Sequence, residues 1–369
     1  MSLLSEYRQV NRLLQEKQQV VFYSESRHYY QYFEKLITDL LQDNNTGICY
    51  ITSDPNDPLL KSSHPKIKVV YVKWMLGFLF SRISADVMIM TMPDLGNYLF
   101  KRSSGVGTYI YIFHAAVSTH LQYRKNAFFN YDAVFCTGEY QVNEIRKAEE
   151  LYAQSQKELI RYGYPLFDTI KAKSVSKDQQ KPAILVAPSW FKDCIFETCF
   201  EELVEQLAKL PYNVFIRSHP EFEKREKKKF RKLREIIRDY SSMSIDQFTN
   251  VIDRLPVTDI LITDRSGIAF EFAFGTMQPV LFIETPMKQT NPDWQKTGWI
   301  PIENEVRDEL GISVLPADLN QLPQKIKEVE LMKASFRQKI QALEKNTFYN
   351  SPGSYRAGVE YVLSKIRTS

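Results

Sequence analysis

The chain has 369 residues, of which 44% are hydrophobic and 25% are charged. This length suits two domains of ordinary size, and the composition excludes wholesale disorder. The formal net charge is only +4, but it is unevenly distributed. Between Glu223 and Arg238, nine Lys or Arg residues stand against three Glu, so this segment carries a net +6 and the rest of the chain −2.

The cysteines and the apolar runs limit the cellular compartments in which we expect the protein. Four scattered cysteines form no CxxC pair, so neither a disulfide framework nor a structural zinc site is expected. The first nineteen residues lack the apolar core of a signal peptide, and the most apolar stretch, Val69–Phe80, is interrupted by Lys73. It is also shorter than the roughly 20 residues of a membrane span. We expect a cytoplasmic protein without metal or cofactor, with peripheral attachment to the inner face of the membrane left open.

The first half of the chain is expected to form a parallel sheet. Short β-branched and aromatic runs recur, and helical patterns such as Tyr29–Gln42 and Gln141–Tyr152 separate several of them. Continuous apolar strands of this kind are typical of a sheet that is buried on both faces. The expected strands are Gln19–Tyr23, Gly47–Ile51, Lys68–Val72, Asp86–Met90, Thr108–Ile112 and Asp132–Cys136.

A polar stretch, Lys171–Lys181, interrupts the pattern and is the best linker candidate. Beyond it the alternation restarts, which implies βαβ units and a second parallel sheet. The expected strands are Ala183–Ala187, Tyr212–Arg217, Asp259–Thr263 and Pro279–Ile283, with weaker ones near Ser242–Ile245 and Ser313–Leu315. The expected helices are Phe196–Leu210, Lys224–Tyr240, Ile268–Gly275 and Leu322–Glu344.

These patterns predict an α/β protein with two Rossmann-like domains facing a cleft. We expect an N-terminal domain over residues 1–175 and a C-terminal domain over 181–345. The last helix, near Tyr355–Ile366 in the segment 350–369, is expected to pack back on the first domain.

Polar side chains follow several expected strands directly, and ligands of open α/β sheets bind beyond the carboxyl ends of the strands. The strand ending at Thr263 leads into a polar turn, with a helix expected from Ile268. This places Ser266 and Gly267 at a helix N-terminus, where free N–H groups and the dipole favour phosphate. The alternative is that Asp264 or Ser266 only caps the helix.

Two of the five histidines, His114 and His219, also follow strong strands. A single strand-end histidine is usually a packed or capping residue, but two at the facing edges of two sheets favour catalysis. One suits a general base on an attacking hydroxyl, and the other, beside Arg217, suits donation to phosphate oxygens. No Asp-x-Asp triplet occurs, so stabilisation of a diphosphate by Arg, His and a helix dipole is the simpler hypothesis. Glu271 either contacts ribose hydroxyls or only complements the helix start.

Taken in order, these segments resemble the CDP-glycerol glycerophosphotransferases of teichoic-acid and capsule synthesis. That family carries aromatic-His-Gly, GYP-x-x-D, APT-W, R-x-H-P and TDYSS elements. The chain has Phe113–Ala115 (FHA), Gly163–Asp168 (GYPLFD), Ala187–Trp190 (APSW), Arg217–Pro220 (RSHP) and Thr263–Gly267 (TDRSG). The order is the same, and the elements extend over nearly half the chain, so the set is fairly specific although each motif is weak singly.

The resemblance implies a GT-B-like fold. It also implies transfer of glycerol phosphate, or a related polyol phosphate, from a CDP-activated donor to a hydroxyl of a cell-surface polymer or lipid-linked acceptor. The base role falls on His114, and donor-phosphate contact falls on His219 with Arg217 nearby. The remaining residues of the implied donor site are Ser189, Asp264, Arg265, Ser266, Gly267 and Glu271.

Several positions depart from the family pattern and leave the donor open. Ala115 stands for Gly, Arg265 for Tyr, and Gly267 for the second Ser, while Phe191 and Lys192 replace a common Arg. An added arginine in the phosphate turn suggests a donor with extra negative charge or in a different position. Two other functions therefore remain open: a glycosyltransferase that uses a nucleotide sugar, and a catalytically idle protein that binds nucleotide or serves as a membrane scaffold.

The basic segment 224–238 is expected to be an amphipathic helix with Phe230, Leu233, Ile236 and Ile237 on one face. The simplest interpretation is a solvated outer helix of the second domain. A surface that contacts an anionic membrane is the second interpretation, since a lipid-linked acceptor must be reached at the leaflet. Nucleic acid is not expected as a partner, because the sequence pI is about 8.6 and no recognised nucleic-acid module occurs.

Overall fold

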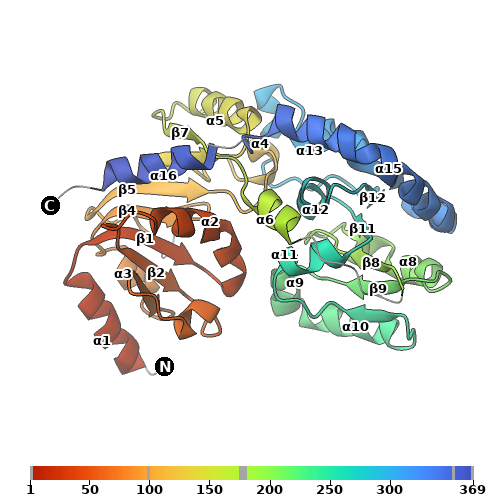
Figure 1. The fold of residues 1–369 in the computed structure, drawn as a ribbon, viewed down its shortest axis with the longest axis horizontal. Coiled ribbons are helices and arrows are strands. Elements are labelled where there is room, and N and C mark those ends of the chain that lie inside the picture. Colours follow the sequence, from red (N-terminus) through yellow and green to blue (C-terminus); the bar gives the residue numbers. More distant parts are fainter. Residues whose placement is uncertain (1–2, 98–99, 174–180, 351–353, 367–369) are drawn as a thin grey trace.

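A computed structural model describes residues 3–97, 100–173, 181–350 and 354–366. Figure 1 shows two α/β domains side by side, each built on one parallel sheet with helices around it. The expected α/β class with two parallel sheets is confirmed. Most of the expected linker, Lys171–Lys181, lies outside the described residues.

The first sheet has seven parallel strands in the order β3-β2-β1-β4-β5-β6-β7. Its six apolar strands were all expected, whereas β7 was not. Only two of the four residues of β7 are apolar, and it lies at an exposed edge, so it lacks the continuous apolar run of the inner strands. The strands are β1 Gln18–Ser24, β2 Ile48–Thr52, β3 Ile67–Tyr71, β4 Ala85–Met90, β5 Val106–Ile112, β6 Ala133–Cys136 and β7 Glu158–Arg161.

Helices cover both faces of the first sheet, and one of them comes from the far end of the chain. The last helix, α16, contacts β7 and α2, so the C-terminal segment lies on the first domain (Figure 1). The helices are α1 Leu3–Leu14, α2 Tyr30–Leu40, α3 Leu76–Phe80, α4 Thr119–Gln122, α5 Glu139–Leu151, α6 Leu166–Ala172 and α16 Ser354–Lys365.

The second sheet has six parallel strands in the order β10-β9-β8-β11-β12-β13, which repeats the winding of the first six strands of the other sheet. The order reverses between β8 and β11, as it does between β1 and β4 in the first sheet. Both weak strands of the sequence prediction are present. The strands are β8 Ala183–Val186, β9 Asn213–Ile216, β10 Met243–Ile245, β11 Ile260–Thr263, β12 Val280–Ile283 and β13 Gly311–Val314.

Two helices expected to be continuous in the second domain are broken. The expected helix Lys224–Tyr240 is divided at Glu226, whose φ and ψ are −108° and 44°. The expected helix Phe196–Leu210 is divided at Cys199, whose φ and ψ are −148° and 20°. The helices are α7 Ile195–Thr198, α8 Phe200–Leu207, α9 Pro220–Arg225, α10 Lys227–Arg238, α11 Val251–Arg254, α12 Ile268–Thr276, α13 Ile302–Glu305, α14 Arg307–Leu310 and α15 Leu322–Thr347. The first break allows Phe222 of α9 and Leu233 of α10 both to be buried.

Aromatic rings join the two domains. Phe167 of α6 lies 5.3 Å from Phe274 of α12, measured between ring centroids. Phe348, which follows α15, lies 5.2 Å and 5.0 Å from these two rings. All three side chains are buried, so a shared apolar core holds α12 against the first domain.

The close approach of α16 to the first sheet predicts the effect of a single methyl group. A Cβ atom at Gly358 would lie 2.4 Å from Cδ2 of Tyr162 and 2.8 Å from Cε2 of Phe135. In an open helix, Gly→Ala stabilises by up to about 1 kcal/mol. Because both rings are buried here, we expect Gly358→Ala to lower the free energy of unfolding by roughly 1–3 kcal/mol. Urea unfolding measures this, with Glu360→Ala on the exposed side of α16 as control; a more stable Gly358→Ala variant would contradict the packing.

Candidate functional site

The candidate site lies where the carboxyl edges of the two sheets meet. His114 follows β5 of the first sheet, while the loops after β8, β9 and β11 carry Ser189, His219 and Ser266. In the second sheet, β8 and β11 are the neighbours between which the strand order reverses, and such a switch point is where open α/β sheets bind ligands.

Asp264 holds the loops of the second domain together. Its carboxylate accepts backbone N–H bonds from Ser189 (2.7 Å), Ile195 (3.0 Å) and Arg265 (2.6 Å). The residue is 0% exposed, so this carboxylate orders the loops after β8 and β11. Ser189 is 5% exposed, and its Oγ has no hydrogen-bond partner among the described residues.

The N-terminus of α12 faces the loop that carries His114. Ser266 is half-buried in the turn before α12. A Cβ atom at Gly267 would lie 3.4 Å from Cβ of Ala115 and 3.4 Å from Cγ1 of Val117. The two departures from the family pattern, Ala115 and Gly267, thus lie opposite each other across the domain boundary. A methyl group at Gly267 would reach van der Waals contact with the Ala115 methyl, and a longer side chain would meet it.

His114 has the geometry of a base. Its Nδ1 lies 3.2 Å from the Thr91 carbonyl oxygen, which can only accept, so Nδ1 carries the proton of the neutral ring. The lone pair of Nε2 is therefore free. Burial lowers the pKa of His114 to about 4, and the Lys288 ammonium also lowers it, whereas the Thr91 carbonyl opposes the shift. Tyr29 and Tyr32 pack edge-on against the imidazole.

His219 has the opposite tautomer. Its Nδ1 accepts the backbone N–H of Glu221 at 3.2 Å and caps α9, so the proton of the neutral ring lies on Nε2. The ring stacks on Trp190 at 5.7 Å. The His219 side chain is exposed, yet desolvation by neighbouring groups, then the charges of Lys288 and His114, lower its pKa to about 4. Neutral His219 therefore presents an N–H donor where neutral His114 presents an acceptor.

The two predicted arginines are already paired. Arg217 contacts Asp246 at 2.5 Å and donates to the carbonyls of Phe248 (2.8 Å) and Thr249 (3.2 Å). Arg265 donates to Glu284 at 2.7 Å and to the Thr285 carbonyl at 3.2 Å. Both guanidinium charges are largely balanced by partners within the second domain, so the two arginines lie at the border of the site.

A cation that sequence reasoning missed lies near the two histidines. Lys288 follows β12 and is half-buried, with no hydrogen bond or ion pair to any residue that the structure describes. Its charge lowers the pKa values of His114 and His219, which places it near both rings. Burial lowers the pKa of Lys288 itself, while Asp264 and Glu303 oppose that shift. The sequence signal that could have found Lys288 is its place in the loop after the expected strand Pro279–Ile283, to which the strand-end rule also applies.

Glu271 lies at the domain interface. It is 6% exposed and accepts a hydrogen bond of 2.9 Å from Tyr164 Oη. Burial raises its pKa to about 7, and the Tyr164 hydroxyl and Arg217 oppose the shift. Tyr164 belongs to the Gly163–Asp168 motif, so that motif connects the first domain to α12. Contact between Glu271 and a ribose stays a prediction.

The structure thus brings His114, His219, Ser189, Ser266 and Lys288 to one edge. Within residues 3–97, 100–173, 181–350 and 354–366, no group of three His, Cys, Asp or Glu side chains has the arrangement of a metal site. No helix in those ranges combines the length and the apolar character that crossing a membrane requires.

Known proteins place the chain in a family. The family model for CDP-glycerol:poly(glycerophosphate) glycerophosphotransferase matches residues 6–289. The chain belongs to this glycerophosphotransferase family. The teichoic acid glycerol-phosphate primase of Bacillus subtilis (strain 168) is 27% identical over 181 residues, which cover 46% of this chain and 44% of the primase. The chain therefore aligns with less than half the length of that relative.

Solved structures agree on the fold of this glycerophosphotransferase family member. The wall teichoic acid polymerase TagF, in a structure obtained with a CDPG soak, is similar with a TM-score of 0.63 at 14% identity, over 99% of both chains. A Staphylococcus aureus MnaA–UDP structure gives a TM-score of 0.61 at 12% identity, over 95% of this chain and 98% of the other. At these identities the likeness concerns the fold, and it confirms the expected GT-B-like architecture.

The surroundings of the two histidines predict how they titrate. Both imidazoles should stay neutral down to about pH 4 in the native protein and titrate near 6.5 in urea. Because the unfolded chain then binds more protons between those values, the free energy of unfolding should fall on acidification through this window. NMR titration of the ring protons, assigned with His114→Gln and His219→Gln, measures this. Native titration near 6.5 would show that the rings are hydrated.

Proposed function

We propose that the chain transfers glycerol phosphate, or a related polyol phosphate, from a CDP-activated donor to a hydroxyl of a polymer or lipid-linked acceptor. Family membership supports the reaction class. The observation that carries the assignment to named residues is the pair of opposite tautomers, a free lone pair on His114 and an N–H donor on His219. A reaction that removes a proton from a hydroxyl while it stabilises phosphate needs one group of each kind.

The proposed step is a displacement at the β-phosphorus of the donor. The acceptor oxygen forms a bond to this phosphorus while His114 Nε2 takes the hydroxyl proton. The bond from the β-phosphorus to the oxygen that bridges the two phosphates breaks, and CMP leaves with the electron pair. His219, Lys288 and the N-terminus of α12 at Ser266 stabilise the phosphate charge.

The low pKa of His114 fits this order of events. In the free protein the imidazole is neutral at pH 7 and ready to accept a proton. A bound diphosphate adds negative charge beside the ring and favours its protonated form, which raises the pKa toward the range where a base is effective. Donor binding therefore strengthens the base only when there is a phosphate to transfer.

A panel of nucleotide-activated donors tests the reaction and its base. We expect CMP release from CDP-glycerol or CDP-ribitol, and a loss of about a hundredfold or more in kcat for His114→Gln. The exposed His64→Gln is the matched control. Turnover confined to UDP-, GDP- or CMP-sugars would establish the glycosyltransferase alternative instead. Nucleotide binding without turnover of any donor would identify a non-catalytic protein.

We further propose that the basic segment 224–238 contacts an anionic membrane surface. Lys229 and Lys232 of α10 are paired with Glu197 (2.8 Å) and Glu201 (2.7 Å). The cations without an acidic partner in the described chain are Lys227, Lys228, Arg231 and Arg234. Three of them line a groove together with Phe230, Met243 and Ile245. Cations above an apolar floor suit lipid headgroups, and we propose a cytoplasmic location at the inner face of the membrane.

Charge reversal tests the membrane contact. Lys227→Glu, Lys228→Glu and Arg231→Glu combined should weaken binding to phosphatidylglycerol vesicles by about tenfold or more, because each basic residue near such a surface contributes about 1 kcal/mol. Activity on a soluble acceptor should not change. The control carries the same charge change at Lys61, Lys101 and Lys209, which are exposed elsewhere. Equal vesicle binding by both triple variants would remove the proposal.

A further inference from the structure

We propose that Glu303 is a positioning residue that fixes the loop carrying His114 against the donor domain. The inference rests on the proposed function, since it assigns His114 as the base. Glu303 belongs to α13 of the second domain, whereas the loop it contacts follows β5 of the first.

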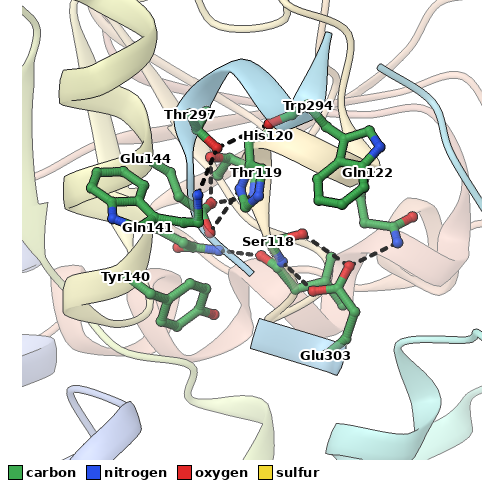
Figure 2. A network of polar contacts seen from close by, with 12 residues as sticks. Ser118, Thr119, His120, Gln122, Tyr140, Gln141, Glu144, Trp294, Thr297 and Glu303 are labelled. Carbon is green, nitrogen blue, oxygen red and sulfur yellow. Dashed lines mark hydrogen bonds and ion pairs between the residues drawn. The ribbon is translucent and has the colours of Figure 1, made fainter. Parts of the chain in front are cut away.

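Within the described chain, the donors that other residues offer to the Glu303 carboxylate come from the first domain. Oε2 accepts the Ser118 backbone N–H at 2.9 Å. Oε1 accepts the Ser118 hydroxyl at 2.9 Å and the Gln122 side-chain amide at 2.8 Å. Figure 2 shows this carboxylate meeting Ser118 and Gln122 together. A carboxylate held at both oxygens fixes direction as well as distance, which apolar packing alone does not.

The rest of the loop is held from the opposite side by α5. Tyr140 Oη donates to the Ala116 carbonyl at 2.8 Å, and Gln141 Nε2 donates to the Val117 carbonyl at 3.0 Å. The Thr119 amide and hydroxyl donate to Glu144 at 2.5 Å and 2.6 Å (Figure 2). Glu303 thus links this loop to the second domain, and it does so through a backbone amide of the loop, that of Ser118.

The same segment of the second domain also carries Lys288. Between Lys288 and Glu303, the backbone amides of Thr290 and Asn291 donate to the Leu121 carbonyl at 3.1 Å and 3.2 Å. Asn291 Nδ2 adds a bond of 2.9 Å to the His120 carbonyl. Residues 288–303 are therefore bound to α4 at two points, just beyond Lys288 and at Glu303. Together these contacts set the position of His114 relative to Lys288.

A positioning role and a merely stabilising role make different predictions for Glu303→Gln. The amide keeps the size of the side chain but replaces an accepting oxygen with an NH₂ group that faces donors. If the bond positions the base, kcat for CMP release should fall about tenfold or more, with KM for the donor within about threefold. If the bond only adds stability, the midpoint of unfolding moves while kcat holds at temperatures where the protein is folded.

Hydrogen exchange supplies a readout that does not depend on activity. The Ser118 and Thr119 amides should exchange about tenfold or more faster in Glu303→Gln, with other segments unchanged. Glu305→Gln, an exposed residue on the same short helix, is the matched control. Ser118→Ala keeps the backbone donor and should give a smaller loss of kcat; it also serves if Glu303→Gln does not fold.

The outcomes separate this inference from the proposed function. Faster exchange confined to residues 115–122, together with a lower kcat, supports the inference. Unchanged exchange at Ser118 overturns it, as does a kcat equal to that of Glu305→Gln. If the wild-type protein releases no CMP from any CDP-polyol, the proposed reaction fails. The positioning role of Glu303 then fails with it, even if hydrogen exchange shows the contact between Glu303 and Ser118.

Discussion

The contact between Phe167, Phe274 and Phe348 is the constraint on which the site depends. It buries aromatic rings from α6, α12 and the end of α15 in one core, so the first domain and α12 cannot move independently without exposing them. Each sheet alone presents polar groups at one edge. Only because this core holds the edges face to face does the start of α12 meet the loop after β5.

The polar contacts at the interface complement this core. Apolar packing is non-directional, whereas the bonds from Tyr164 to Glu271 and from Ser118 to Glu303 specify orientation. The cations near the site also differ in whether they are paired. Arg217 and Arg265 are paired within the second domain, whereas Lys288 makes no ion pair in the described chain and its charge lowers the pKa of both histidines. Under the proposed function, a donor phosphate is the partner that Lys288 would pair with.

Much of the fold and part of the site could be predicted from sequence. Strands β1 to β6 are continuous apolar runs, and the strand-end rule selected His114, His219 and Ser266. The break at Glu226 could not be predicted, since Glu suits a helix interior and the break serves burial of Phe222. Lys288 lies in no motif. The pairing of Arg265 with Glu284 depends on two strands being neighbours, which the local sequence does not report. The tautomer of His114 is likewise set by a backbone group distant in sequence, the Thr91 carbonyl.

Ala115 and Gly267 carry a consequence for how members of this family diverge. One residue has gained a methyl group relative to the family pattern and the other has lost a side chain, and the two positions touch across the domain boundary. A methyl group at Gly267 would already be in van der Waals contact with Ala115 and Val117, so a longer side chain there would need space that the first domain occupies. We therefore expect the residues at these two positions to change together. Recombination between relatives at the inter-domain boundary would separate a matched pair, even where each half folds well by itself.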